Sequence, residues 1–184
     1  MRKLIYHVST TLDNFICQED GSIAGFLAEG DHIPDYIDSL KNYDAVIMGK
    51  STYEFGYGYG LKPGMAPYPT MKNYVFSQSI HIDSIDERLT IVRSNAISFI
   101  RDLKNTNGGT IYLCGGGIFA SSLLDNNLID SLMIKLNPVL LGKGIRLFQK
   151  SRSKVDLCLL DTKIYNSGVV LLTYDIKEVK EPSN

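Results

Sequence analysis

The sequence predicts an α/β fold of three layers, with a mostly parallel central sheet, helices on both faces and a C-terminal antiparallel β-hairpin. The first reason is that short apolar, β-prone runs alternate with segments of helical periodicity over most of the chain. The second is that an alternating run at 155–163 is followed by the turn residues Asn166-Ser167-Gly168 and by another β-prone run at 169–176.

The composition fits one domain in a reducing compartment. With 184 residues, of which 44% are hydrophobic, the chain can bury one sizeable core. We expect a single domain at 1–178 and a frayed polar tail at 179–184. The net charge of −1 gives no reason to expect nucleic acid or a membrane surface as a partner. No run is long enough for a membrane span or a secretory signal, and the three cysteines lack a metal-binding spacing. The sequence therefore predicts a cytoplasmic protein with buried, reduced thiols and no metal site.

Local patterns predict each strand and helix in turn. Strands are expected at 4–9, 45–48, 73–76, 89–92, 111–114 and 131–141, where apolar and β-prone residues are concentrated. Helices are expected at 34–43, where Pro34 suits a first turn, at 95–105, with Ser94 as a possible N-cap, and at 118–124. Pro138 indicates a bulge or an edge position in the last of these strands. The loop at 10–30 is long enough to be functional, and we expect it to act as a lid.

Two of these strands end in glycine and lead directly into a helix. The strand at 111–114 is followed by Gly115, Gly116 and Gly117, and the strand at 45–48 is followed by Gly49-Lys50-Ser51-Thr52. Glycines expose the backbone, and the first N–H groups of a helix attract anions. Lys50 and two hydroxyl groups add further donors beside the second turn. Both turns are therefore predicted to bind phosphate.

The residues of both turns also have structural explanations that involve no phosphate. The glycines at 115–117 can simply let a helix pack closely on the sheet, and Ser51 can act as a helix cap. The spacing of Gly115, Gly117 and Ala120 also fits the fingerprint G-x-G-x-x-A of a Rossmann dehydrogenase. We disfavour that fold because its fingerprint normally follows the first strand, and because an acidic residue normally ends the next strand. Here the next strand ends on apolar residues.

Polar residues also follow the strands at 73–76 and 89–92, namely Ser77-Gln78 and Arg93-Ser94. In a mainly parallel sheet these ends lie at the same edge as the glycine turns, where open α/β sheets bind ligands. Arg93 could then face an additional phosphate, although it could equally be a solvated charge at a strand end.

Three segments together resemble the dihydrofolate-reductase-like superfamily, and most closely the reductase domain of bacterial bifunctional riboflavin-biosynthesis deaminase/reductases. They are VIMGKSTYE at 46–54, KNYVFSQS at 72–79 and CGGGIFASSLLDNNLIDSLMIKLNPVLLGKGIRLF at 114–148. The resemblance covers nearly the whole chain. It implies the dihydrofolate-reductase-like fold, NADPH as the cofactor, a homodimer, and a heterocyclic substrate such as a phosphoribosylamino-uracil, a dihydropterin or dihydrofolate.

The resemblance also implies which residues bind the cofactor. One turn would contribute Gly49, Lys50, Ser51 and Thr52, with Ser77, Gln78 and Arg93 nearby, and the other would contribute Gly115, Gly116, Gly117, Ile118 and Phe119. The segment TLDNFI at 11–16 would approach the nicotinamide through Asn14 and Ile16. Asn14 replaces the glycine that the family usually has, and asparagine tolerates positive φ better than most residues.

The catalytic acid is implied least directly. Dihydrofolate reductases carry a carboxylate on the first helix, and the segment GDHIPDYIDSL at 30–40 offers Asp31 and Asp35, of which Asp35 is our prediction. Its structural alternative is an acidic residue that complements the helix dipole. The function also has an alternative, a catalytically silent nucleotide-binding module on the same fold, which the Asn14 replacement and the lack of an obvious acid suggest.

Overall fold

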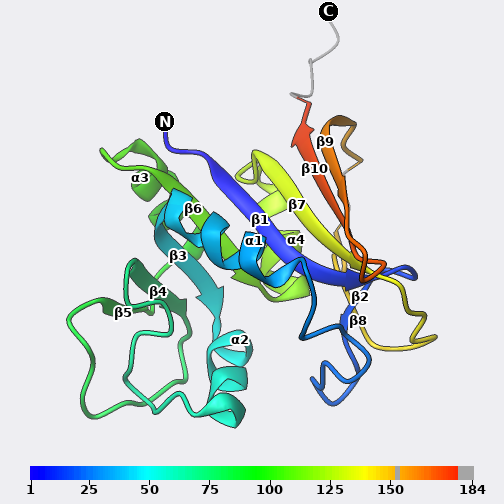
Figure 1. Cartoon of the computed structure of the whole chain (residues 1–184). Coiled ribbons are helices and arrows are strands. Elements are labelled where there is room, and N and C mark those ends of the chain that lie inside the picture. Colours follow the sequence, from blue (N-terminus) through cyan, green and yellow to red (C-terminus); the bar gives the residue numbers. More distant parts are fainter. Residues whose placement is uncertain (152–153, 178–184) are drawn as a thin grey trace, which may run out of the picture.

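The structure is a computed structural model that describes residues 1–151 and 154–177, so the tail predicted at 179–184 lies outside the described residues. Its main sheet contains β1 (Leu4–Thr11), β3 (Tyr43–Gly49), β4 (Lys72–Phe76), β5 (Leu89–Val92), β6 (Thr110–Gly115), β7 (Ser131–Asn137), β9 (Leu157–Ile164) and β10 (Val170–Ile176). The strand order is β5-β4-β3-β6-β1-β7-β10-β9 (Figure 1). All neighbours from β5 to β7 are parallel, whereas β10 is antiparallel to both β7 and β9. The predicted parallel sheet and terminal hairpin are confirmed.

Helices cover both faces of this sheet, which confirms the three layers. They are α1 (Ile33–Ser39), α2 (Lys50–Phe55), α3 (Ala96–Asn105) and α4 (Gly117–Asp125), with short 3-10 helices η1 (Leu40–Asn42) and η2 (Gly56–Tyr59). On one face, Ile47 packs in a core with Ile100 of α3 and Leu123 of α4. On the other face, its neighbour Met48 packs in a second core with Tyr53 of α2. In Figure 1, α1 crosses in front of the sheet and α4 lies behind it. Within the described residues, the helices are too short or too polar to cross a membrane.

The loop predicted at 10–30 contains a short strand that the sequence pattern did not reveal. This strand, β2 (Phe15–Cys17), pairs antiparallel with β8 (Ile145–Arg146). The guanidinium of Arg146 lies 5.2 Å from the centre of the Phe15 ring. A strand of three residues is too short for periodicity to appear, and its partner is far away along the chain. The pairing anchors the start of the loop to the segment that follows β7.

Several predicted boundaries are wrong by a few residues, each for a local reason. The predicted helix at 34–43 ends at Ser39, continues as η1, and gives way to β3 at Tyr43. The N-cap of α3 is Asn95 instead of Ser94, because the Asn95 side chain accepts hydrogen bonds from the amides of Ile97 and Ser98. The predicted strand at 131–141 ends at Asn137. Pro138 therefore follows an interior strand, and it marks neither a bulge nor an edge.

The expectation of buried thiols is wrong for one cysteine. All three cysteines are free, but only Cys17 and Cys114 are partly buried, and Cys158 is exposed. Cys158 lies on β9, the last strand of the sheet, whose eight residues are all exposed.

Candidate functional site

A cavity of about 750 Å³ lies at the carboxyl edge of the parallel strands. Ten of the fifteen residues predicted at a site line it, namely Ile16, Gly49, Lys50, Ser51, Thr52, Gly115, Gly116, Gly117, Ile118 and Phe119. The strand ends account for this convergence. Met48 of β3 is paired with Gly115 of β6, so the two glycine turns leave the sheet side by side. The cavity therefore lies where two helix N-termini and their free amide groups meet.

The turn after β6 requires glycine for structural reasons. Gly116 has φ 101° and ψ 101°, which a residue with a side chain rarely adopts. A Cβ atom on Gly117 would lie 2.3 Å from the backbone oxygen of Arg146. A Cβ atom on Gly116 would also come within 3.5 Å of the Thr52 hydroxyl, which belongs to the other turn. The positive φ therefore accounts for Gly116, and close packing accounts for Gly117, without a ligand.

Gly49 is different, because nothing in the protein requires a glycine there. Its φ is −80° and its ψ is 165°, an extended conformation that any residue adopts. A Cβ atom on Gly49 would meet no atom within 4 Å. Gly49 is the N-cap of α2, and no side chain caps this helix, so the idea that Ser51 acts as a cap is wrong. The space beside Gly49 opens into the cavity.

Three predicted phosphate ligands, Ser77, Gln78 and Arg93, lie near Lys50 without lining the cavity. Lys50 itself lies 3.4 Å from the Ser79 hydroxyl and 3.6 Å from a carboxylate oxygen of Glu54. Ser77 accepts hydrogen bonds from the amides of Ser79 and Ile80, and Gln78 belongs to the same turn. Arg93 donates a hydrogen bond of 2.7 Å to the Ile80 carbonyl. These three residues and Lys50 thus surround the turn that follows β4.

The predicted nicotinamide loop is held firmly at its base. Asn14 has φ 72°, so it adopts the positive φ that its replacement of glycine requires. Asn14 does not line the cavity, and its carbonyl accepts a hydrogen bond from the Leu147 amide. The carboxylate of Asp13 accepts hydrogen bonds from the amides of Leu141 and Gly142. Of the two loop residues predicted to bind the cofactor, only Ile16 reaches the cavity wall.

Asp35, the predicted acid, lies outside the main cavity and lines a small cavity of about 30 Å³ beside it. Its carboxylate forms an ion pair with Lys163 and accepts a hydrogen bond of 2.6 Å from the Tyr165 hydroxyl. The hydrogen bonds from Lys163 and Tyr165 lower the pKa of Asp35. Asp31 accepts hydrogen bonds from the amides of Asn166 and Ser167. Asp35 thus connects α1 to the terminal hairpin, and Asp31 connects the segment before α1 to the same hairpin. A catalytic role of Asp35 stays a prediction.

A second group of residues in the cavity consists of His7, Tyr36, Tyr68, Tyr112 and Lys135. The loop of Tyr68, at 57–69, is rich in glycine, proline and tyrosine, a pattern that predicts an aromatic rim, but sequence reasoning missed the other four residues. The His7 ring lies 5.5 Å from the Tyr36 ring and 5.7 Å from the Tyr112 ring. A lone lysine inside an apolar strand, as in SLMIKLN at 131–137, was the one signal that could have indicated this group. The other members are aromatic residues in ordinary surroundings, and only the fold brings them together.

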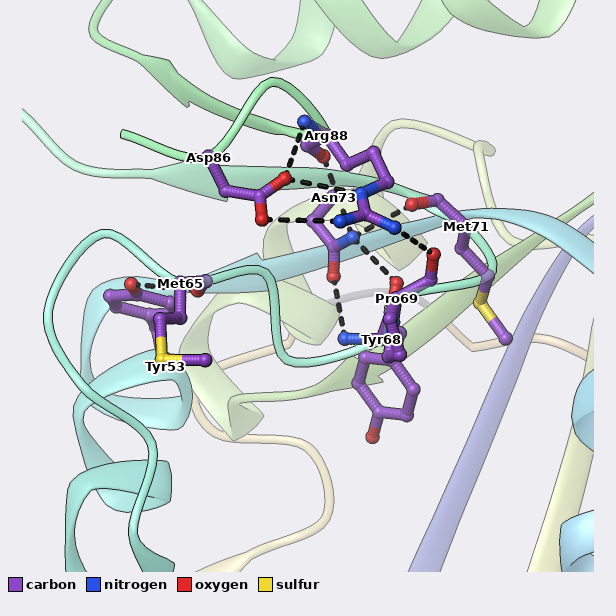
Figure 2. Close-up of polar contacts among 8 residues, drawn as sticks. All are labelled: Tyr53, Met65, Tyr68, Pro69, Met71, Asn73, Asp86 and Arg88. Atoms are coloured by element: carbon purple, nitrogen blue, oxygen red, sulfur yellow. Dashed lines mark hydrogen bonds and ion pairs between the residues drawn. The ribbon is translucent and has the colours of Figure 1, made fainter. Parts of the chain in front are cut away.

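A buried asparagine positions Tyr68 in this group. The amide nitrogen of Asn73 donates hydrogen bonds of 2.9 Å and 2.8 Å to the carbonyls of Tyr68 and Met71, and its oxygen accepts one from the Tyr68 amide (Figure 2). From the segment before β5, Arg88 donates a hydrogen bond to the Pro69 carbonyl beside Tyr68 and pairs with Asp86 (Figure 2). The Tyr68 hydroxyl lies 3.2 Å from the Cys114 sulfur. Asn73 thereby fixes the loop that brings Tyr68 to the cavity.

The electrostatic character of the cavity comes from a few side chains. Burial, assisted by the positive charge of Lys135, lowers the pKa of His7 to about 4, so His7 is neutral at pH 7. Burial raises the pKa of Tyr68 and Tyr112 well above the usual value, so both are neutral donors. Lys50 and Lys135 carry positive charge, and no aspartate or glutamate is present among the described residues that line the cavity. The cavity is thus suited to an anionic or acceptor-rich ligand.

Known proteins share this architecture. Residues 2–171 match the family described as the RibD C-terminal domain. The uncharacterized protein YwjB of Bacillus subtilis is 36% identical over 174 residues, which are 92% of this chain and 96% of YwjB. A solved protein of Shewanella sp. PV-4 assigned to riboflavin biosynthesis superposes with a TM-score of 0.80 at 21% identity, over 97% of this chain and all of the other.

The bifunctional pyrimidine deaminase and 5-amino-6-(5-phosphoribosylamino)uracil reductase of Thermotoga maritima superposes with a TM-score of 0.71 at 16% identity. The match covers 96% of this chain and 57% of the Thermotoga protein. At this identity the likeness shows the fold alone. The family match over nearly the whole chain and the similarity to YwjB go further: this protein belongs to the RibD C-terminal domain family.

Proposed function

We propose that this protein is a cytoplasmic NADPH-dependent reductase of a small planar heterocycle. The observation that carries the proposal is Gly49, because its missing side chain leaves open space beside a helix N-terminus and serves no purpose in the protein itself. The adjacent turn at Gly115, Gly116 and Gly117 offers a second set of amide groups to the same space. Two such turns on one cavity suit the two phosphates of a pyrophosphate.

The residues around the cavity fit the parts of NADPH. Lys50, Ser51 and Thr52 would bind the pyrophosphate together with the amides of Ile118 and Phe119. Ser77, Gln78 and Arg93 would bind the additional phosphate that distinguishes NADPH from NADH, since they surround the turn next to Lys50. Asn14 and Ile16 would hold the loop near the nicotinamide. NADPH supplies the hydride, and the protein contributes orientation and exclusion of water.

The candidate substrates are a phosphoribosylamino-uracil, which the related Thermotoga reductase is named for, and a dihydropterin or dihydrofolate. Asp35, which the sequence analysis predicts as the catalytic acid, is the candidate proton donor. The second candidate function is a nucleotide-binding module without catalysis. It is favoured by the absence of a carboxylate among the described residues of the cavity wall, because no obvious general acid then faces a substrate.

The homodimer is proposed on the exposed edge of the sheet. Leu159, Leu160 and Ile164 of β9 are 53%, 56% and 76% exposed, and an edge strand offers unpaired backbone groups to another strand. A second copy of the chain could cover these apolar side chains and pair with the backbone groups of β9. Light scattering at micromolar concentration tests this, and a monomer mass would rule it out.

The function is tested by titrating NADPH and NADH into the wild type, Lys50→Ala and the control Lys41→Ala, with nucleotide fluorescence as the readout. Lys41 is an exposed lysine outside the cavity. We expect the wild type to prefer NADPH, and Lys50→Ala to weaken NADPH binding by about tenfold, as for the loss of one charged hydrogen bond. Absence of binding by either nucleotide would overturn the proposal. Turnover of any candidate heterocycle would exclude the silent module.

A further inference from the structure

Lys135 lies in the part of the cavity that the glycine turns do not occupy. It belongs to β7, and β1 separates this strand from β6 and its glycine turn. Lys135 is paired with Ser9 of β1, and both line the cavity together with His7. A cofactor that occupies the two turns therefore leaves this part of the cavity for another molecule.

The ammonium group of Lys135 has no anionic partner within the described residues. Its Nζ donates a hydrogen bond of 2.9 Å to the Leu27 carbonyl and lies 3.4 Å from Nε2 of His32. The carboxylate of Asp35 lines the neighbouring small cavity, but it is paired with Lys163 and Tyr165. Burial alone lowers the pKa of Lys135, with no carboxylate acting to raise it.

An ammonium group in this position costs stability, because a partly buried charge without a counterion loses hydration that neutral partners replace only in part. An ammonium has three N–H donors, and among the described residues only the Leu27 carbonyl and Nε2 of His32 lie within hydrogen-bond distance of Lys135 Nζ. The neutral donors Tyr36 and Tyr68 line the same cavity. A ligand that brings a negatively charged or carbonyl oxygen would satisfy Lys135, whereas a basic, amino-rich ring would need a carboxylate, and none lines the cavity among the described residues.

On the basis of the proposed function, we propose that Lys135 binds a substrate oxygen and so selects planar rings that present acidic imide or carbonyl groups. Amino-rich basic rings would be rejected, because their donors would face the Lys135 ammonium group. Lys135 would thus distinguish candidate substrates by whether the edge of the ring that faces it carries carbonyl or amino groups. This makes Lys135 a specificity-determining residue.

The test uses two small rings of equal size and opposite hydrogen-bonding edges. Barbiturate is an anion at neutral pH with a carbonyl-rich edge, and melamine carries amino groups around its ring. Calorimetric titrations of both rings, with and without saturating NADPH, compare the wild type with Lys135→Met, Lys135→Arg and the control Lys41→Met. Lys135→Met keeps the length of the side chain and removes its charge. The same samples are titrated with NADPH alone.

We expect the wild type and Lys41→Met to bind barbiturate at least about tenfold more tightly than melamine. Lys135→Met should weaken barbiturate binding by about tenfold to about a hundredfold, as for a hydrogen bond to a charged group. Lys135→Arg should retain most of the affinity, and NADPH binding should be unchanged in all variants. No barbiturate binding to the wild type, no preference over melamine, or an unchanged affinity in Lys135→Met would overturn the proposal. If barbiturate binding depends on Lys135 while NADPH fails to bind the wild type, the reductase proposal alone is lost.

Discussion

Asn73 and Tyr68 are joined by reciprocal hydrogen bonds, in which the Asn73 side chain both accepts from the Tyr68 amide and donates to the Tyr68 carbonyl. Asn73 is fully buried in β4, and Tyr68 lies in the irregular segment between η2 and this strand. One side chain therefore adds to the few backbone hydrogen bonds that this loop makes. The relationship also explains how a loop residue acquires a fixed position on the cavity wall.

Asn73→Ala should reduce the free energy of unfolding by about 3 kcal/mol, because it removes the hydrogen bonds that the side chain makes to the Tyr68 amide and to the carbonyls of Tyr68 and Met71. Urea denaturation measures this loss. Asn126→Ala is the matched control, since Asn126 donates a single exposed hydrogen bond to the Ser122 carbonyl, and its loss should be less than about 1 kcal/mol. Equal stabilities of the two variants would show that Asn73 does not hold the loop.

Gly49→Ala should separate ligand binding from stability. Because a methyl group at Gly49 meets no protein atom within 4 Å, the free energy of unfolding should change by less than about 1 kcal/mol, the usual effect at an N-cap. The methyl group would project into the proposed pyrophosphate site, so NADPH affinity should fall by about tenfold or more.

The comparison for Gly49→Ala is Gly117→Ala, whose Cβ atom would lie 2.3 Å from the Arg146 oxygen. That variant should lose about 2 kcal/mol or more of stability through overpacking. Unchanged NADPH affinity in Gly49→Ala would contradict the assignment of this turn to the cofactor.

His7 should make the stability of the protein depend on pH. Its pKa is about 4 in the folded protein against 6.5 for the ordinary group, so the unfolded chain takes up a proton first as pH falls. Stability should be constant above about pH 6.5 and decrease down to about pH 4, by an order of 3 kcal/mol in total. The carboxylates of Asp13, Asp31 and Asp35 have pKa values below 3.8 and act in a lower range.

Denaturation of the wild type and His7→Phe at several pH values between these limits measures the effect of His7. The variant should lose most of the dependence, whereas His81→Asn, which changes an exposed histidine, should retain it. A wild-type curve that is flat from about pH 4 to about pH 6.5 would show that folding does not lower the pKa of His7.

The sequence alone determined the fold class and the two glycine turns of this protein. The alternation of apolar runs and periodic helices specifies a parallel sheet, and glycines directly after two strands specify turns that expose backbone amides. These features are local, because each depends on residues within one strand, turn or helix. Ten of the residues that the sequence and the family resemblance indicated as cofactor ligands line the cavity, and their role in binding stays a prediction.

Only the tertiary structure decided which distant residues meet. Phe15 pairs with Arg146, and Asp35 pairs with Lys163, across gaps in the chain that no local pattern encodes. Lys135 faces the cavity because β7 lies beside β1 in a particular register, so that Lys135 and Ser9 are neighbours. Likewise, Gly117 appears as a phosphate ligand in sequence, but the close approach of Arg146 gives it a packing role as well. Chemistry that depends on side chains from several strands becomes visible only when the register of those strands is known.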